Sequence, residues 1–209
     1  MEVHGYKATP SDLIRGSNAV LFFENGFGLE LWSDKFTSNL DVKRISMSDN
    51  LKPIYIAEDA YKGKPNPHAW ISPRRGKLYI DSIVKALKDL DPENSSFFEE
   101  NGTIYKTKIN KIDEDFKLFL NTIEKSKRYL VSCEGAFTYL VNDYGLKEAY
   151  LWPVNAESQV TPKRMAKVIS LIKENKIPSV FCESTVSSEA QLTVARESGA
   201  KFAGNFYVD

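Results

Sequence analysis

The stretch YKTKINKIDEDFKLFLNTI, residues 105–123, decides the fold. Its apolar side chains recur at spacings of 4, 3, 4, 3 and 4 residues: Tyr105, Ile109, Ile112, Phe116, Phe119 and Ile123. This is the period of one face of an α-helix. The other faces carry Lys, Asp and Glu and should be solvated. So long a helix fits a spine along one flank of the molecule, and Gly102 near its start should cost about 1 kcal/mol relative to alanine.

Strand-like and helix-like segments alternate on both sides of this helix. Before it we expect strands over 18–23 and 42–46, a helix start at Thr9-Pro10, and helices over 28–40 and from Ser72 to about Asp91. After it we expect strands over 128–132, 149–152, 179–182 and 202–208, with helices over 136–143, 161–174 and 187–197. This alternation is typical of α/β proteins with mainly parallel strands. We therefore predict an N-terminal lobe (1–91), a spine helix (92–125) and a C-terminal lobe (126–209).

Residues 48–67 show no periodicity and are predicted to form a long loop. A loop of that length in a compact chain usually has a function or links two parts. It ends in Gly63-Lys64-Pro65-Asn66-Pro67, directly before one of the two histidines.

The composition excludes several classes of partner. The 209 residues are 42% hydrophobic, and 28 basic side chains balance 28 acidic ones. A net charge of zero gives no electrostatic footprint for nucleic acid or an anionic membrane. No apolar run reaches 18 residues, so no transmembrane helix is expected. The opening MEVHGYKATP resembles neither a signal peptide nor a lipidation signal.

The two cysteines, Cys133 and Cys182, stand far apart and lack CxxC spacing. They say little about the redox compartment, and we expect each to be a small buried hydrophobic side chain. Both ends of the chain look cut, because a parallel α/β lobe that ends on a bare strand leaves one sheet face without helical cover. We therefore expect a fragment, truncated at both ends, of a longer protein.

Polar residues just past predicted strands are the first candidates for a site, because ligands of α/β folds bind beyond the carboxyl ends of parallel strands. The candidates are His4, Glu24, His68, Glu134, Glu183 and Asp209. Each histidine stands shortly before a helix start, and each would otherwise be an ordinary polar loop residue. Glu134 and Glu183 can also be read as helix-start acids, which gain roughly 0.3–1 kcal/mol from the helix dipole. Asp209 is the last residue, which by itself suggests a frayed end.

Two histidines and two carboxylates make a closed site for Mn(II), Fe(II) or Zn(II). Enzyme signatures are missing: the sequence has no GxSxG, GxxxxGK[ST], GxGxxG or HExxH motif. A metal enzyme needs an open coordination position, and four protein ligands leave little room for one. A metal-dependent hydrolase or oxygenase that uses the same residues is the alternative.

Seven segments resemble the manganese, iron and zinc solute-binding proteins of bacterial metal ABC importers. They run in order along the whole chain: VHGYKATPSDL, ENGFGLELW, GKPNPHAWISP, LVSCEGAFTYL, YLWPVNAESQVTP, VFCESTVS and ARESGAKFAGNFYVD. The resemblance is greatest to the manganese- and iron-binding members. Zinc-dedicated relatives tend to have a third histidine in place of Glu134 and a His-rich acidic loop, and this sequence has neither.

The resemblance implies two Rossmann-like lobes joined by one long spine helix. It implies that one metal ion is bound by His4 in VHGYKATP, His68 in NPHAW, Glu134 in CEGAF and Asp209 in FYVD. Glu24 and Glu183 match positions near the cleft that are not ligands. Family members carry a signal or lipoprotein peptide before the His4 motif and continue beyond the Asp209 motif.

The resemblance also implies a function. We expect an extracytoplasmic, monomeric binding protein that is not an enzyme. It would capture Mn(II) or Fe(II), or alternatively Zn(II), and deliver it to an ABC-transporter permease. An adhesin role is a remote alternative, because nothing in the sequence encodes a partner surface.

Overall fold

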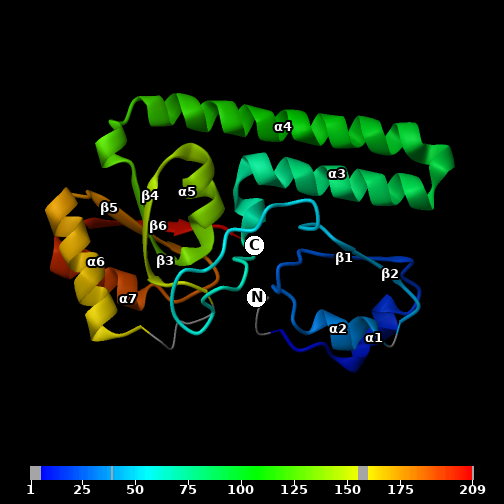
Figure 1. Ribbon diagram of the computed structural model, residues 1–209, viewed down its shortest axis with the longest axis horizontal. Coiled ribbons are helices and arrows are strands. Elements are labelled where there is room, and N and C mark those ends of the chain that lie inside the picture. The colour runs from blue at the N-terminus through cyan, green and yellow to red at the C-terminus, as the bar shows by residue number, and fades with distance from the viewer. Residues whose placement is uncertain (1–5, 39, 155–159, 209) are drawn as a thin grey trace. The chain divides into compact units, whose positions relative to one another are not determined.

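The computed structural model describes residues 6–38, 40–154 and 160–208, and helices and strands alternate along them (Figure 1). The predicted α/β class is therefore confirmed. The chain divides into two compact units. Unit 1 comprises Met1–Pro53 and Pro73–Asp113, and unit 2 comprises Ile54–Ser72 and Glu114–Asp209.

The described part of unit 1 combines a small parallel sheet with helices. Its elements are α1 (Pro10–Gly16), β1 (Leu21–Glu24), α2 (Ser33–Thr37), β2 (Lys43–Ser46), α3 (Pro73–Leu90), the 3-10 turn η2 (Pro92–Asn94) and most of α4 (Ser95–Asn121). Strands β1 and β2 pair in parallel. Helix α1 begins at Pro10, where the Asp12 carboxylate accepts the Thr9 backbone N–H at 2.8 Å. The helix start predicted from Thr-Pro is thus present.

Helix α2 is much shorter than the predicted helix over 28–40. The backbone takes positive φ at Gly26 (83°), Phe27 (52°) and Gly28 (79°), which no α-helix can continue. The Glu30 carboxylate stabilises this turn by accepting the backbone N–H groups of Asn25 (2.8 Å) and Gly26 (3.3 Å). The apolar pattern correctly predicted a helix, but the turn precedes it, so the helix begins only at Ser33.

The long helix α4 is present and runs without a break from unit 1 into unit 2. Its predicted core face was partly wrong. Tyr105, Ile112 and Phe119 are 57%, 57% and 62% exposed, whereas Leu120 is buried. The buried side of the helix also includes Asp113, whose Oδ1 lies 3.4 Å from Arg74 Nε on α3. The buried face therefore differs from the most apolar stripe and includes an ion pair with the neighbouring helix.

Gly102 allows α3 and α4 to approach closely, which corrects its interpretation as a weak point. A Cβ at this position would lie 2.5 Å from Val84 Cγ2 and 3.5 Å from Ile80 Cγ2 of α3. Contacts at the shorter distance are not tolerated in folded proteins. The missing side chain therefore serves helix packing, which sequence propensity alone does not reveal.

Unit 2 carries the larger core. Its elements are η1 (Ala69–Ile71), η3 (Lys125–Lys127), β3 (Tyr129–Glu134), η4 (Gly135–Phe137), α5 (Thr138–Tyr144), β4 (Lys147–Trp152), α6 (Pro162–Asn175), β5 (Ser179–Glu183), α7 (Glu189–Ser198) and β6 (Lys201–Phe206). Strands β3 and β4 pair in parallel, as do β5 and β6, and β3 lies beside β5. Helices α6 and α7 lie on one side of these strands and α5 on the other (Figure 1).

The strand β3 alternates between two apolar layers. Val131 and Cys133 belong to the core cluster that includes Val168 and Ile172 of α6, while Leu130 belongs to the cluster that includes Val141 of α5. Because successive strand side chains point to opposite faces, Glu134 points away from the face of Cys133.

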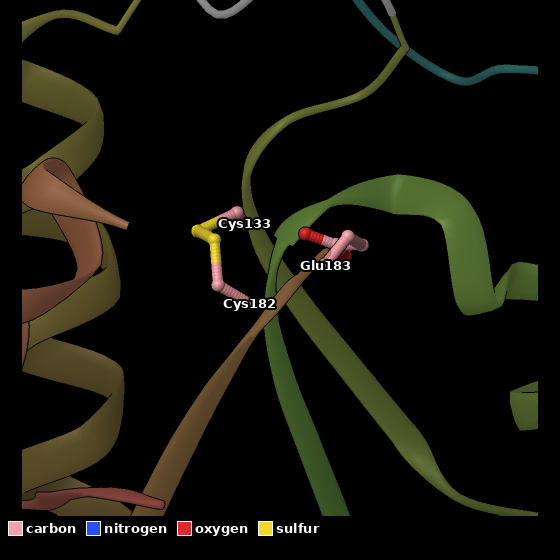
Figure 2. Close-up of side chains that lie close together, drawn as sticks. All are labelled: Cys133, Cys182 and Glu183. Carbon is pink, nitrogen blue, oxygen red and sulfur yellow. A yellow bond between two sulfur atoms is a disulfide. The ribbon is translucent and has the colours of Figure 1, made fainter. Parts of the chain in front are cut away.

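Cys133 and Cys182 form a disulfide, so describing them as two independent hydrophobic side chains was wrong. Both are fully buried, as expected, but each lies one residue before the end of its strand, in β3 and β5, with Cα atoms 4.8 Å apart. Figure 2 shows the bond on one side of the strands and the Glu183 side chain on the other. Spacing of 49 residues in sequence gave no sign of this proximity.

The segment Ile54–Ser72 is fastened to unit 2 by hydrogen bonds. Tyr139 of α5 accepts the Ile54 N–H through its hydroxyl oxygen at 3.1 Å and donates its hydroxyl to the Asn66 carbonyl at 2.7 Å. Farther along, the Trp70 indole donates to the Val208 carbonyl (3.1 Å). The predicted loop is therefore irregular but well held, and it brings its histidine to the end of β3.

Among the helices of residues 6–38, 40–154 and 160–208, none combines the length and apolar character needed to cross a membrane.

Candidate metal centre

Two of the four predicted ligands come together in unit 2. His68 Nε2 lies 4.0 Å from Glu134 Oε1, and the two residues are 4% and 5% exposed. A metal ion bonds to imidazole nitrogen and carboxylate oxygen at about 2.0–2.2 Å, so one ion can bridge atoms at this separation. His4 and Asp209 lie outside the described residues, and their part in the site stays a prediction.

The Asn66 amide fixes the protonation pattern of His68. Asn66 Oδ1 accepts the His68 backbone N–H at 3.0 Å, which identifies this atom as the oxygen. The same oxygen lies 2.9 Å from His68 Nδ1, so Nδ1 must carry the ring proton. In the neutral ring, Nε2, the atom that faces Glu134, then presents the lone pair that binds a metal.

The same amide also holds the chain next to Glu134. Asn66 Nδ2 donates to the Gly135 carbonyl at 2.7 Å, and Asn66 is buried. A Cβ on Gly135 would lie 2.7 Å from the Pro153 carbonyl oxygen, so a larger residue does not fit there. Asn66 was not among the predicted site residues, although its place two residues before His68 was the available signal.

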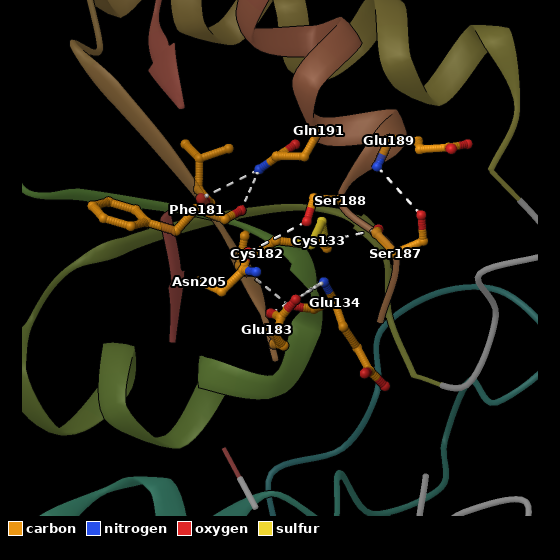
Figure 3. Close-up of a disulfide and its surroundings, with 12 residues drawn as sticks. Cys133, Glu134, Phe181, Cys182, Glu183, Ser187, Ser188, Glu189, Gln191 and Asn205 are labelled. Carbon is orange, nitrogen blue, oxygen red and sulfur yellow. Dashed lines mark hydrogen bonds between the residues drawn. A yellow bond between two sulfur atoms is a disulfide. The ribbon is translucent and has the colours of Figure 1, made fainter. Parts of the chain in front are cut away.

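Glu183 supports Glu134 from the neighbouring strand. Both carboxylate oxygens of Glu183 accept the Glu134 backbone N–H at 3.3 Å (Figure 3). Glu183 is fully buried, and this burial, with the negative charge of Glu134, raises its pKa to about 8. Through its hydrogen bonds to the backbone N–H, the Glu183 side chain supports Glu134 at the end of β3.

One other group of metal-binding atoms lies close together among the described residues, namely Cys133, Cys182 and Glu183. Its sulfur atoms are joined in the disulfide and are not thiolates, the form in which cysteine binds metals. Glu24, the remaining candidate, lies in unit 1, where its carboxylate pairs with Arg44 at 2.7 Å and accepts the Ser33 hydroxyl at 2.8 Å. Glu24 therefore has a structural partner.

Comparisons with known proteins show the family to which the chain belongs. The chain matches the family model "ZnuA: Zinc-uptake complex component A periplasmic" over residues 1–209. It is 43% identical to the iron-binding protein YfeA of Yersinia pestis, covering 100% of this chain and 67% of that protein. It is 32% identical to the manganese ABC transporter substrate-binding lipoprotein PsaA of Streptococcus pneumoniae, covering 99% of this chain and 69% of that protein.

Solved structures show the same fold. A Mn-bound periplasmic metal-binding protein from Candidatus Liberibacter asiaticus, an S38A mutant, matches with a TM-score of 0.92 and 38% identity, covering 100% of this chain and 77% of that one. A crystal structure of ZnuA matches with a TM-score of 0.84 and 25% identity, covering 99% and 77%. The chain belongs to the ZnuA family of metal ABC-transporter solute-binding proteins.

Proposed function

We propose that this chain captures one divalent transition metal ion outside the cytoplasmic membrane and delivers it to the permease of an ABC importer. The ligands are His68 and Glu134, completed by His4 and Asp209, and the protein carries out no reaction on the ion. Mn(II) or Fe(II) is the expected cargo, with Zn(II) as the other candidate. Two relatives are named for iron and manganese, and one solved relative holds Mn.

The observation that carries this proposal is the buried pair of His68 and Glu134. A histidine that is held through Nδ1, with Nε2 4.0 Å from a buried carboxylate, is arranged to bind a cation in its neutral form. Mixed nitrogen and oxygen ligands suit Mn(II) and Fe(II), and the Irving–Williams order favours Zn(II) over both. Metal supply therefore contributes to which ion is carried.

The disulfide agrees with a location outside the cytoplasm. Disulfides persist in oxidising compartments such as the bacterial periplasm and the cell surface. Cys133 and Cys182 are joined and fully buried. The names of the relatives, periplasmic and lipoprotein, point the same way.

Replacing His68 by Ala tests the proposal. We expect the affinity for Mn(II), measured by isothermal titration calorimetry, to fall by orders of magnitude. The metal-induced rise in melting temperature should disappear, because a ligand stabilises only the state that binds it. Tyr207→Ala, at an exposed residue outside the proposed ligand set, is the control and should bind like the wild type. An unchanged isotherm for His68→Ala would contradict the assignment.

A second measurement distinguishes a metal-binding transport protein from a metal-dependent enzyme. Four protein ligands should leave no rapidly exchanging water on bound Mn(II), whereas a metal-dependent enzyme keeps such a position open. Water-proton relaxation by the Mn(II) complex reports the exchange. Strong relaxation together with hydrolysis of model esters would favour the enzyme alternative.

A further inference from the structure

Two polar residues, Thr138 at the start of α5 and Glu148 in β4, are connected to the His68–Glu134 pair by hydrogen bonds. The Thr138 hydroxyl oxygen accepts a proton of Asn66 Nδ2 at 3.3 Å. It lies 2.9 Å from Glu148 Oε2 and 3.1 Å from the Gly135 carbonyl oxygen. All of these residues belong to unit 2. A continuous set of hydrogen bonds therefore runs from Glu148 through Thr138 and Asn66 to the His68 ring.

The Thr138 hydroxyl has one hydrogen and two acceptors within reach. Glu148 Oε2 is the nearer acceptor, and hydrogen bonds to carboxylates are stronger than those to neutral carbonyls. The hydrogen therefore points to Glu148, and a lone pair faces Asn66 Nδ2. This leaves the Gly135 carbonyl to Asn66, which donates to it at 2.7 Å.

Glu148 is costly for the fold. Its Oε1 is buried, and it has no hydrogen-bond partner among the described residues. Burial also raises its pKa to about 7. A buried polar atom without a partner destabilises the folded protein, and such exceptions to local rules concentrate at functional sites.

We propose that Thr138 and Glu148 are positioning residues for the metal site, which hold the Asn66 amide and, through it, the His68 ring with Nδ1 protonated and Nε2 facing Glu134. The inference deepens the proposed function and rests on it, because its main consequence is metal affinity. Residues behind metal ligands commonly change affinity by about 10–100-fold.

The test compares variants that break the connection with variants that keep it. Thr138→Val and Glu148→Met remove the hydroxyl and the acceptor, and each should weaken Mn(II) binding about tenfold. Thr138→Ser and Glu148→Gln keep them and should bind almost like the wild type. The control Thr107→Val removes an exposed hydroxyl that donates only to the Thr103 carbonyl of the same helix, and it should leave binding unchanged.

Two further readouts separate positioning from general damage. The melting temperature of metal-free Glu148→Met should equal or exceed that of the wild type, because the unpartnered carboxylate is gone. The ¹⁵N spectrum of the metal-free protein should show His68 protonated at Nδ1 in the wild type and a larger Nε2–H fraction in Thr138→Val and Glu148→Met.

Wild-type affinity and an unchanged His68 tautomer in both disruptive variants would overturn the inference. So would affinity losses that the conservative variants share and that follow a lower melting temperature. If the wild type binds no metal, the proposed function fails. The tautomer measurement on the metal-free protein then still decides whether Thr138 and Glu148 position His68.

Discussion

Asn66 and Glu183 hold the His68–Glu134 pair by different means. The Asn66 side chain forms a hydrogen bond of 2.9 Å with His68 Nδ1. It forms another, of 2.7 Å, with the carbonyl of Gly135, the residue after Glu134. Glu183 contacts the Glu134 backbone N–H, and no hydrogen bond between Glu183 and the Glu134 side chain is seen among the described residues. Asn66 therefore holds the side chain of a proposed ligand, whereas Glu183 supports the backbone at the end of β3.

This separation predicts unequal effects at the two glutamates. Glu134→Gln should weaken Mn(II) binding by orders of magnitude, because it removes an anionic ligand. Glu183→Gln should weaken binding far less, since an amide oxygen can still accept the Glu134 N–H. Calorimetric titration of both variants under one set of conditions checks this. Equal losses would mean that Glu183 is itself a ligand.

At the scale of elements, the contact between α3 and α4 depends on the absence of a side chain. Gly102→Ala should destabilise the protein by about 1–3 kcal/mol through overpacking against Val84, despite the gain of about 1 kcal/mol in helix propensity. Urea unfolding measures the change. Thr103→Ala, one position along and exposed, should be neutral or stabilising.

A double-mutant cycle locates the cause of the Gly102 effect. Val84→Ala removes the Cγ2 atom that a new Cβ would meet at 2.5 Å. Gly102→Ala should therefore cost clearly less in the Val84→Ala background. An equal cost in both backgrounds would show that Val84 is not the obstacle, and a stabilising Gly102→Ala would restore the interpretation from helix propensity.

At the scale of the whole molecule, two buried carboxyls give the stability of the metal-free protein a pH dependence opposite to the one expected for metal binding. The pKa of Glu148 is raised to about 7 and that of Glu183 to about 8, both from 4.5. The folded protein therefore retains protons that the unfolded chain releases. The free energy of unfolding due to these groups falls as pH rises from about 5 to about 8.

Metal binding should instead strengthen over the lower part of this range. Imidazoles must lose their proton to bind a metal, and their reference pKa is about 6.5. We expect the metal-free protein to melt at a lower temperature at pH 8 than at pH 5.5, and added Mn(II) to raise the melting temperature more at the higher pH. Glu148→Gln should flatten the pH dependence of the metal-free protein. A metal-free melting temperature that rises steadily over this range would contradict the assignment of these carboxyls as the cause.

The sequence by itself determined the α/β class, the long helix and the pairing of His68 with Glu134 as candidates. Periodicity, Thr-Pro helix starts and the resemblance of whole segments are local signals, so they can be read without coordinates. Glu134 was recognisable because it ends an apolar strand before a Gly-Ala-Phe turn. The metal, the permease and the roles of His4 and Asp209 remain predictions.

Only the tertiary structure decided which residues meet. The Cys133–Cys182 disulfide, the role of Gly102, the buried face of α4 and the set formed by Asn66, Thr138 and Glu148 join residues 10 to 72 positions apart. Such contacts depend on how strands and helices pack, and propensity at one position carries no information about its distant neighbour. A buried carboxylate like Glu148 is unfavourable by every local rule, so only its neighbours in space explain its presence.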